Sequence, residues 1–220
     1  VERICLNLLL QQQPVFAEDL RRVSAALKMI TDMERIGDQA SDIAEIIGFL
    51  NGRIGTDAQY ICQMAVAAMR MVTESVEAYV KRDVAMAEAT IQHDDVVDDL
   101  FLKVKDSLIQ MISENPKDGE YALDLLMIAK YFERIGDHAS DIAELILRIK
   151  SDHAYHIVQH LPAMAASAQK MVHDAVETFI KQDVKEAEEI IRRDDEVDAL
   201  FNQVKTDVVE LLKSSPSHAD

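Results

Sequence analysis

A twelve-residue motif occurs twice in this chain of 220 residues and limits what it can fold into. The copies are ERIGDQASDIAE, beginning at Glu34, and ERIGDHASDIAE, beginning at Glu133. They lie 99 residues apart and differ at one position, which is Gln39 in the first copy and His138 in the second. Each copy has acids at every fourth residue, a spacing that predicts a helix with an acidic face.

The acids of each copy form a short stripe, because four residues of an α-helix advance about 6 Å and rotate about 40°. The stripes consist of Glu34, Asp38 and Asp42, and of Glu133, Asp137 and Asp141. The other side of the first helix carries an apolar face, which we expect to be buried: Met33, Ile36, Ala40, Ile43 and Ile47. Like charges at this spacing repel by a few tenths of a kcal/mol per pair. Water on a solvated face or a bound cation could relieve this repulsion, and the duplication favours a cation.

The apolar period and the Gly, Asn and Pro breaks predict helices along the whole chain. We expect them at 16–50, 57–81, 83–115, 120–150, 162–181 and 183–213, with a further helix end at 1–13. The repeat includes more than the motif, since DDVVDDLF at Asp94 recurs as DDEVDALF at Asp194. The unit is therefore three helices in about 100 residues, which indicates an all-α duplicated bundle rather than a solenoid.

Three segments follow from this repeat. Residues 1–55 are predicted to be the C-terminal part of a first unit, comprising half a helix and the long helix with the first motif. Residues 56–151 form a complete three-helix unit, and residues 152–220 form a two-helix unit that could complete a bundle with 1–55.

Charge and composition limit the kinds of partner and the compartment that suit this chain. The formal net charge is −17, which makes nucleic acid and anionic membranes poor partners and makes cations or a basic protein surface better ones. No apolar run approaches the length of a membrane span, so contact with a membrane would be peripheral at most. Cys5 and Cys62 stand alone, which is typical of a reducing cytoplasm.

A second acidic pair could join each stripe. Asp94 and Asp98 are four residues apart on the helix that precedes the second motif. If these helices pack antiparallel, the pair faces Glu133, Asp137 and Asp141, and five carboxylates could hold a cluster of Fe, Zn, Mn, Mg or Ca ions. The alternative is an acidic patch near a helix start, where the helix dipole favours Asp.

These segments resemble the PhoU family of phosphate-responsive regulators. The resemblance rests on the two ERIGD motifs and on DDVVDDLF and DDEVDALF, and it extends over nearly the whole chain. It implies two three-helix bundles with carboxylate-bound metal clusters on their surfaces. Fe and Zn are the metals it favours. It also implies a homodimeric, non-enzymatic negative regulator of phosphate uptake and phosphate-starvation signalling. The expected partners are a sensor histidine kinase and the ATPase of the phosphate-specific transporter.

The helix order departs from that family, whose members repeat three helices twice. Here the opening helix and half of the next are absent from the start, and an extra helix pair follows the second motif. The stripe at Glu34 could therefore recruit Asp194 and Asp198 from the C-terminal pair, within the chain or from another subunit.

Other patterns in the sequence are weaker evidence for a functional site. His153, His156 and His160 have a helix-compatible spacing, but a solvated helix start explains them better than a metal site. His138 is either an outer neighbour of a metal site or simply exposed. A metal-dependent phosphohydrolase or oxidase, and a purely structural helical scaffold, are the alternatives to a regulator. The enzyme would need an open metal position and a dry pocket, which a surface stripe does not obviously supply.

Overall fold

The computed structural model describes residues 17–50, 58–148, 160–181 and 183–214. Every regular element in these ranges is helical and no strand occurs in them, which confirms the all-α prediction. The helices are α2 (Ala17–Phe49), α3 (Gln59–Lys81), α4 (Val84–Glu114), the 3₁₀ turn η2 (Pro116–Asp118), α5 (Gly119–Arg148), α6 (Leu161–Lys181) and α7 (Val184–Ser214). The helix end predicted at 1–13 lies outside the described residues.

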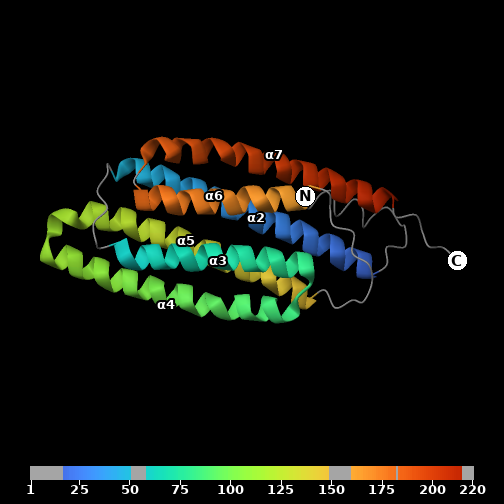
Figure 1. Cartoon of the computed structure of the whole chain (residues 1–220), viewed down its shortest axis with the longest axis horizontal. Helices are drawn as coiled ribbons and strands as arrows, with labels where there is room; N and C mark the ends of the chain where they lie inside the picture. Colours follow the sequence, from blue (N-terminus) through green and yellow to red (C-terminus); the bar gives the residue numbers. More distant parts are fainter. Residues whose placement is uncertain (1–16, 51–57, 149–159, 182, 215–220) are drawn as a thin grey trace.

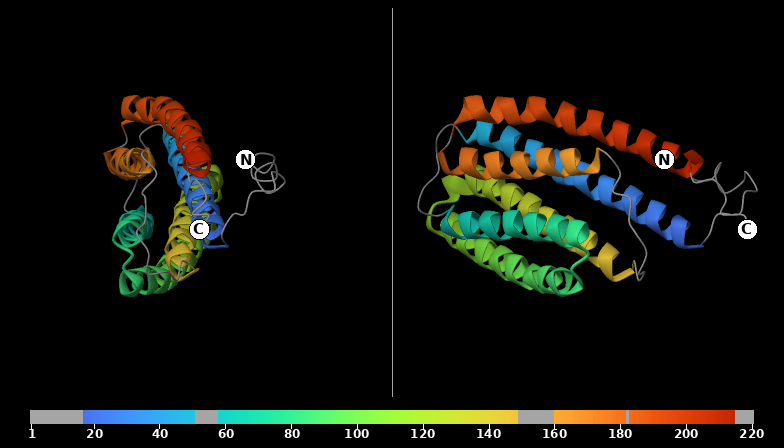
Figure 2. Two further views of the ribbon diagram at one scale, coloured as in Figure 1. Left: turned by 90° about the vertical axis from the view of Figure 1, so that its right-hand side faces the viewer. Right: turned by 45° about the vertical axis from the view of Figure 1, so that its right-hand side comes forward.

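The helices form two bundles that meet along α2 and α5 (Figure 1). One bundle contains α3, α4 and α5, and the other contains α2, α6 and α7. Four helices make a curved layer in the order α7, α2, α5, α4, and α3 and α6 lie together on one side of it (Figure 2). The C-terminal pair thus returns to pack on α2 of the same chain.

The core lies between this layer and the α3–α6 pair. The five apolar residues predicted on the buried face of α2 are each at most 1% exposed, which confirms the helical period. On α5, Ile128, Phe132, Ile135 and Ile142 are fully buried in the same continuous cluster. Because one face of each long helix is buried in this way, the opposite face of the four-helix layer is left for the acidic stripes.

Local sequence signals fix the connection from α3 to α4. Arg82 ends α3 in the left-handed conformation, with φ at 55°. Asp83 then caps α4, because its side chain accepts a hydrogen bond of 3.0 Å from the backbone N–H of Met86. Such a cap satisfies one of the amide groups that a helix start leaves unpaired.

The Asp83 cap gives a first prediction. We expect Asp83→Ala to lower the free energy of unfolding by about 1 kcal/mol, the usual cost of losing an N-cap. The matched control is Asp106→Ala, which removes an exposed acid from the middle of the same helix. Urea denaturation of both variants checks this, and an equal loss in both would show that the cap contributes nothing.

Candidate metal centres

The first acidic cluster lies where α5 crosses α4. Gly136 of the second motif is at the crossing: a Cβ atom added to it would lie 3.3 Å from Asp94 Oδ1 and 3.4 Å from Val97 Cγ1. The missing side chain therefore lets the acids of the two helices approach each other. Burial first, and then the negative charges of Asp137 and Asp98, raise the pKa of Asp94 to about 6.

The second cluster repeats this arrangement where α2 crosses α7. A Cβ atom added to Gly37 would lie 3.3 Å from Val197 Cγ1 and 3.4 Å from Asp194 Oδ1. Burial, followed by the charges of Asp38 and Asp198, raises the pKa of Asp194 to about 6. The acids that lie beside the first motif, Asp194 and Asp198, thus come from α7 of the same chain.

The structure brings together most of the predicted ligands. In one cluster Asp94, Asp98, Glu133 and Asp137 interact electrostatically, and in the other Glu34, Asp38, Asp42, Asp194 and Asp198 do. The same crowding acts on the neighbouring acids, because burial and then adjacent carboxylates raise the pKa of Asp38 and of Asp137.

Three of the acids predicted as ligands also have partners within the protein. Glu133 forms a salt bridge with Lys130 on its own helix. Asp141 Oδ2 lies 2.9 Å from Lys28 Nζ on α2, and Asp42 is hydrogen-bonded to Tyr131 on α5. Asp42 and Asp141 therefore contact the other bundle, and Asp141 is not among the acids shown above to interact in the α4–α5 cluster.

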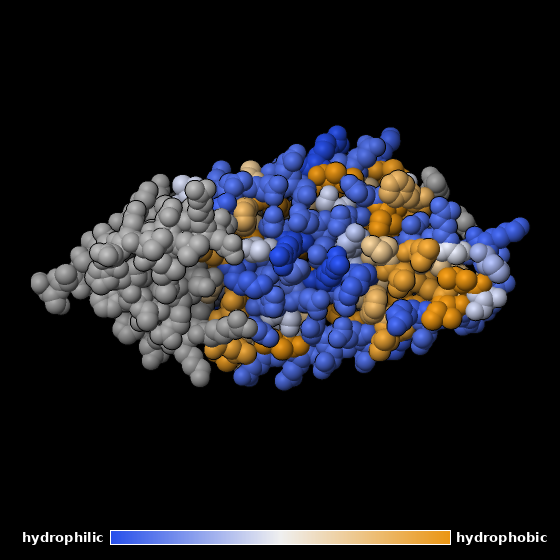
Figure 3. Space-filling model, turned by 180° about the vertical axis from the view of Figure 1, so that it is seen from behind, coloured by the Kyte–Doolittle hydropathy of each residue, from blue (hydrophilic) through white to orange (hydrophobic). Residues whose placement is uncertain are grey.

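Seen from the side opposite to α3 and α6, hydrophilic residues dominate the middle of the molecule (Figure 3). Clustered carboxylates are the donors that hard cations such as Mg²⁺, Mn²⁺ and Ca²⁺ prefer, and they also bind Fe and Zn. Like-charged side chains repel one another, so rotation of these acids would have to accompany binding of a shared ion.

The four histidines that the sequence singled out as candidates lie in three different settings. His153 and His156 lie outside the described residues. His160 is tied to α7, since its backbone N–H and its Nδ1 are 3.1 Å and 2.6 Å from Asp207 Oδ2. His138 is mostly buried between the bundles, with Nδ1 3.2 Å from Asp32 Oδ1.

Sequence reasoning missed Asp32 and Lys28. The available signal was a comparison of the two repeats: where the first has Asp32 and Gln39, the second has Tyr131 and His138. Both differences fall on the faces of α2 and α5 that meet.

The fold and these clusters define a class of all-helical two-bundle protein with duplicated acidic sites. A family model described as the PhoU domain matches residues 1–47, 61–146 and 161–220. The chain belongs to the PhoU family, as its sequence motifs predicted.

Three relatives are each named as a phosphate-specific transport system accessory protein PhoU homologue. The Clostridium acetobutylicum protein is 36% identical over 66% of this chain and 66% of its own length. The Borreliella burgdorferi protein is 29% identical over 68% of this chain and 70% of its own length. The Burkholderia protein is 32% identical over 68% of this chain and 65% of its own length. The matched part therefore spans about two thirds of these relatives.

These names describe accessory proteins and not enzymes, as the sequence predicted for this chain. Within the described residues, no helix is both long enough and apolar enough to cross a membrane.

Proposed function

We propose that this protein is a metal-binding regulator of phosphate uptake in the cytoplasm, and that its two acidic clusters are the metal sites. The observation that carries the proposal is the paired crossing of α5 on α4 and α2 on α7. At each crossing a motif glycine removes the barrier to close approach and acids of two helices gather. Membership of a family of phosphate-transport accessory proteins supports the regulatory role.

The proposed mode of action is docking, without chemical turnover. Metal ions would cancel the repulsion between carboxylates and leave a less acidic face for a partner. The partners proposed from the family are a sensor histidine kinase and the ATPase of the phosphate-specific transporter, and the protein would act as a homodimer. A basic patch on such a partner could then contact the acidic surface that surrounds the metal-filled clusters, since the whole chain has a net charge of −17.

Metal content is the first test of this function. Elemental analysis of protein purified without chelator is expected to give several Fe, Zn or Mn ions per chain. Asp94→Asn/Asp98→Asn should lose those of one cluster and keep those of the other. The control Asp99→Asn/Asp106→Asn changes the net charge equally at exposed positions of the same helix and should keep all of them.

Partner capture then separates a regulator from a structural scaffold. Binding to the kinase or to the transporter ATPase should weaken when the ions are removed by chelation and recover when they are returned. If the wild-type protein takes up no metal and still folds, the clusters are solvated surface and the proposal is wrong. If metal is bound but its removal leaves partner binding unchanged, the ions have only a structural role.

A further inference from the structure

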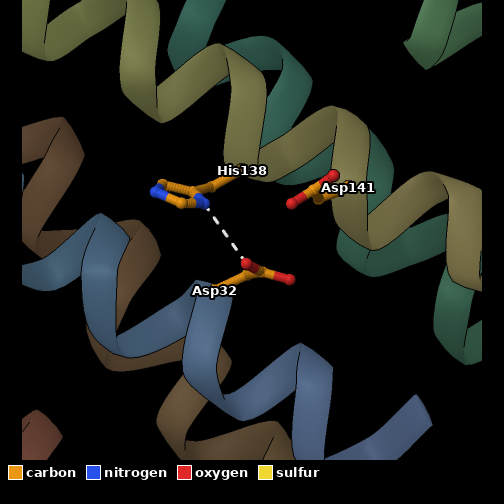
Figure 4. A group of neighbouring side chains, drawn as sticks. All are labelled: Asp32, His138 and Asp141. Atoms are coloured by element: carbon orange, nitrogen blue, oxygen red, sulfur yellow. Dashed lines mark hydrogen bonds and ion pairs between the residues drawn. The ribbon is translucent and has the colours of Figure 1, made fainter.

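A second kind of polar group lies between the bundles, apart from the α4–α5 and α2–α7 crossings. Asp32 of α2 points toward His138 and Asp141 of α5 (Figure 4). One ligand atom from each of these three residues lies within 4.8 Å of the other two. No other group of three such residues meets this criterion among the described parts of the chain.

Asp32 is the buried member of this group. Its side chain is 0% exposed, which is costly for an ionised carboxylate unless its oxygens are well paired. Oδ1 accepts a hydrogen bond of 2.8 Å from Lys28 Nζ and lies 3.2 Å from His138 Nδ1. Oδ2 has no hydrogen-bond partner in the described part of the protein. Most buried carboxylate oxygens have a donor, so Oδ2 is an acceptor position that a ligand could occupy.

The space already accommodates a positive charge. Lys28 Nζ lies 2.8 Å from Asp32 Oδ1 and 2.9 Å from Asp141 Oδ2, so its ammonium bridges the two carboxylates. The Lys28 side chain is 41% exposed, and its flexible stem can turn out to solvent. Lys28 thus acts as a tethered cation that a metal ion could replace.

The other half of the repeat shows that this arrangement is not a structural requirement of the fold. At the positions equivalent to Lys28, Asp32, His138 and Asp141, 99 residues away, stand Met127, Tyr131, Gln39 and Asp42. There Tyr131 is hydrogen-bonded to Asp42, and two carboxylates no longer face each other. The single residue that distinguishes the two motifs therefore supplies the imidazole of this group.

We propose that Asp32, His138 and Asp141 form a third metal site, specific for a borderline dication such as Zn²⁺, that displaces Lys28 and ties α2 to α5. Two carboxylate oxygens and one imidazole nitrogen, with water in the remaining position, are donor types that Zn²⁺ accepts in a four-coordinate site. The imidazole disfavours Mg²⁺ and Ca²⁺, which prefer oxygen alone. The site goes beyond the proposed function, because it uses a different interface and a different donor set.

The test uses two variants that copy the other repeat. His138→Gln introduces the residue found at position 39, and Lys28→Met introduces the residue found at position 127. Metal-free wild type and both variants are titrated with Zn²⁺ by calorimetry. The wild type should bind one more equivalent than His138→Gln. Lys28→Met should bind that equivalent at least about tenfold more tightly, because the competing ammonium is gone.

The two variants are expected to change zinc affinity in opposite directions, and this distinguishes a ligand site from a structural ion pair. X-ray absorption at the zinc edge with one equivalent of Zn²⁺ should show imidazole ligation in the wild type that His138→Gln loses. Equal zinc stoichiometry in the wild type and His138→Gln, or zinc binding weakened by Lys28→Met, would overturn the proposal. Circular dichroism checks folding, and if Lys28→Met unfolds, the His138→Gln comparison alone decides. The acidic clusters are unchanged in both variants, so their own test is independent.

Discussion

The metal-free protein is expected to be stabilised at neutral pH when Asp94 and Asp194 are both replaced by asparagine. The pKa of each is raised from 3.8 to about 6 by burial and by neighbouring carboxylates. The folded state therefore holds these protons more tightly than the unfolded state. Well below pH 3.8 both groups are protonated in either state and cost nothing. As the pH rises from about 4 to 6 the unfolded chain releases these protons while the folded protein still holds them, so stability falls.

The size of the effect follows from the same pKa values. A rise from 3.8 to about 6 corresponds to roughly 3 kcal/mol for a fully shielded group. Because Asp94 and Asp194 are partly exposed, solvent screening reduces this to about 1–2 kcal/mol each. The double variant should thus match the wild type well below pH 3.8 and exceed its free energy of unfolding by about 2–4 kcal/mol at pH 7.

Urea denaturation in the presence of chelator at several pH values measures this difference. Asp99→Asn is the control, since it removes an exposed acid from α4 and should change stability by less than about 0.5 kcal/mol at any pH. Divalent metal should remove the advantage of the Asn variant, because bound cations stabilise only a wild type that retains its ligands. A difference that does not depend on pH would mean that neither burial nor the neighbouring carboxylates raise these pKa values in the fold.

Local features of the fold could be predicted from the sequence. The apolar period of α2 identified Met33, Ile36 and Ile43 as core residues, and all three are fully buried. The Asp83 start of α4 was visible because capping depends on a residue and its neighbours three positions on. The helix ends at Lys81 and Lys181 agree with the prediction for the same reason.

Long-range partners could not be predicted with the same certainty. The sequence left open whether α7 packs on α2 of the same chain, because periodicity identifies an apolar face without identifying what covers it. Asp32 and His138 are 106 residues apart in the sequence. Each looks like an ordinary polar residue on its own helix. The role of Gly37 and Gly136 also required the crossing helices, although the repeat had marked both positions. That the acidic clusters hold metal stays a prediction.

The second large prediction concerns Gly136, the glycine at the α4–α5 crossing. We expect Gly136→Leu to lower the free energy of unfolding by about 1–3 kcal/mol, the usual cost of overpacking. Even a Cβ atom would lie 3.3 Å from Asp94 Oδ1 and 3.4 Å from Val97 Cγ1, so a leucine must push α4 away from α5. That movement should also separate Asp94 and Asp98 from the motif acids and weaken metal binding at this cluster.

Gly48→Leu is the matched control for this change. No atom lies within 4 Å of a Cβ atom added to Gly48 near the end of α2, so a side chain there begins in open space. Since glycine inside a helix costs about 1 kcal/mol relative to good helix formers, Gly48→Leu should be neutral or slightly stabilising. Urea denaturation and metal titration of both variants give the comparison. If Gly136→Leu behaves like Gly48→Leu, the close approach of α4 and α5 is not what the motif glycine provides, and the geometric basis of the acidic cluster fails with it.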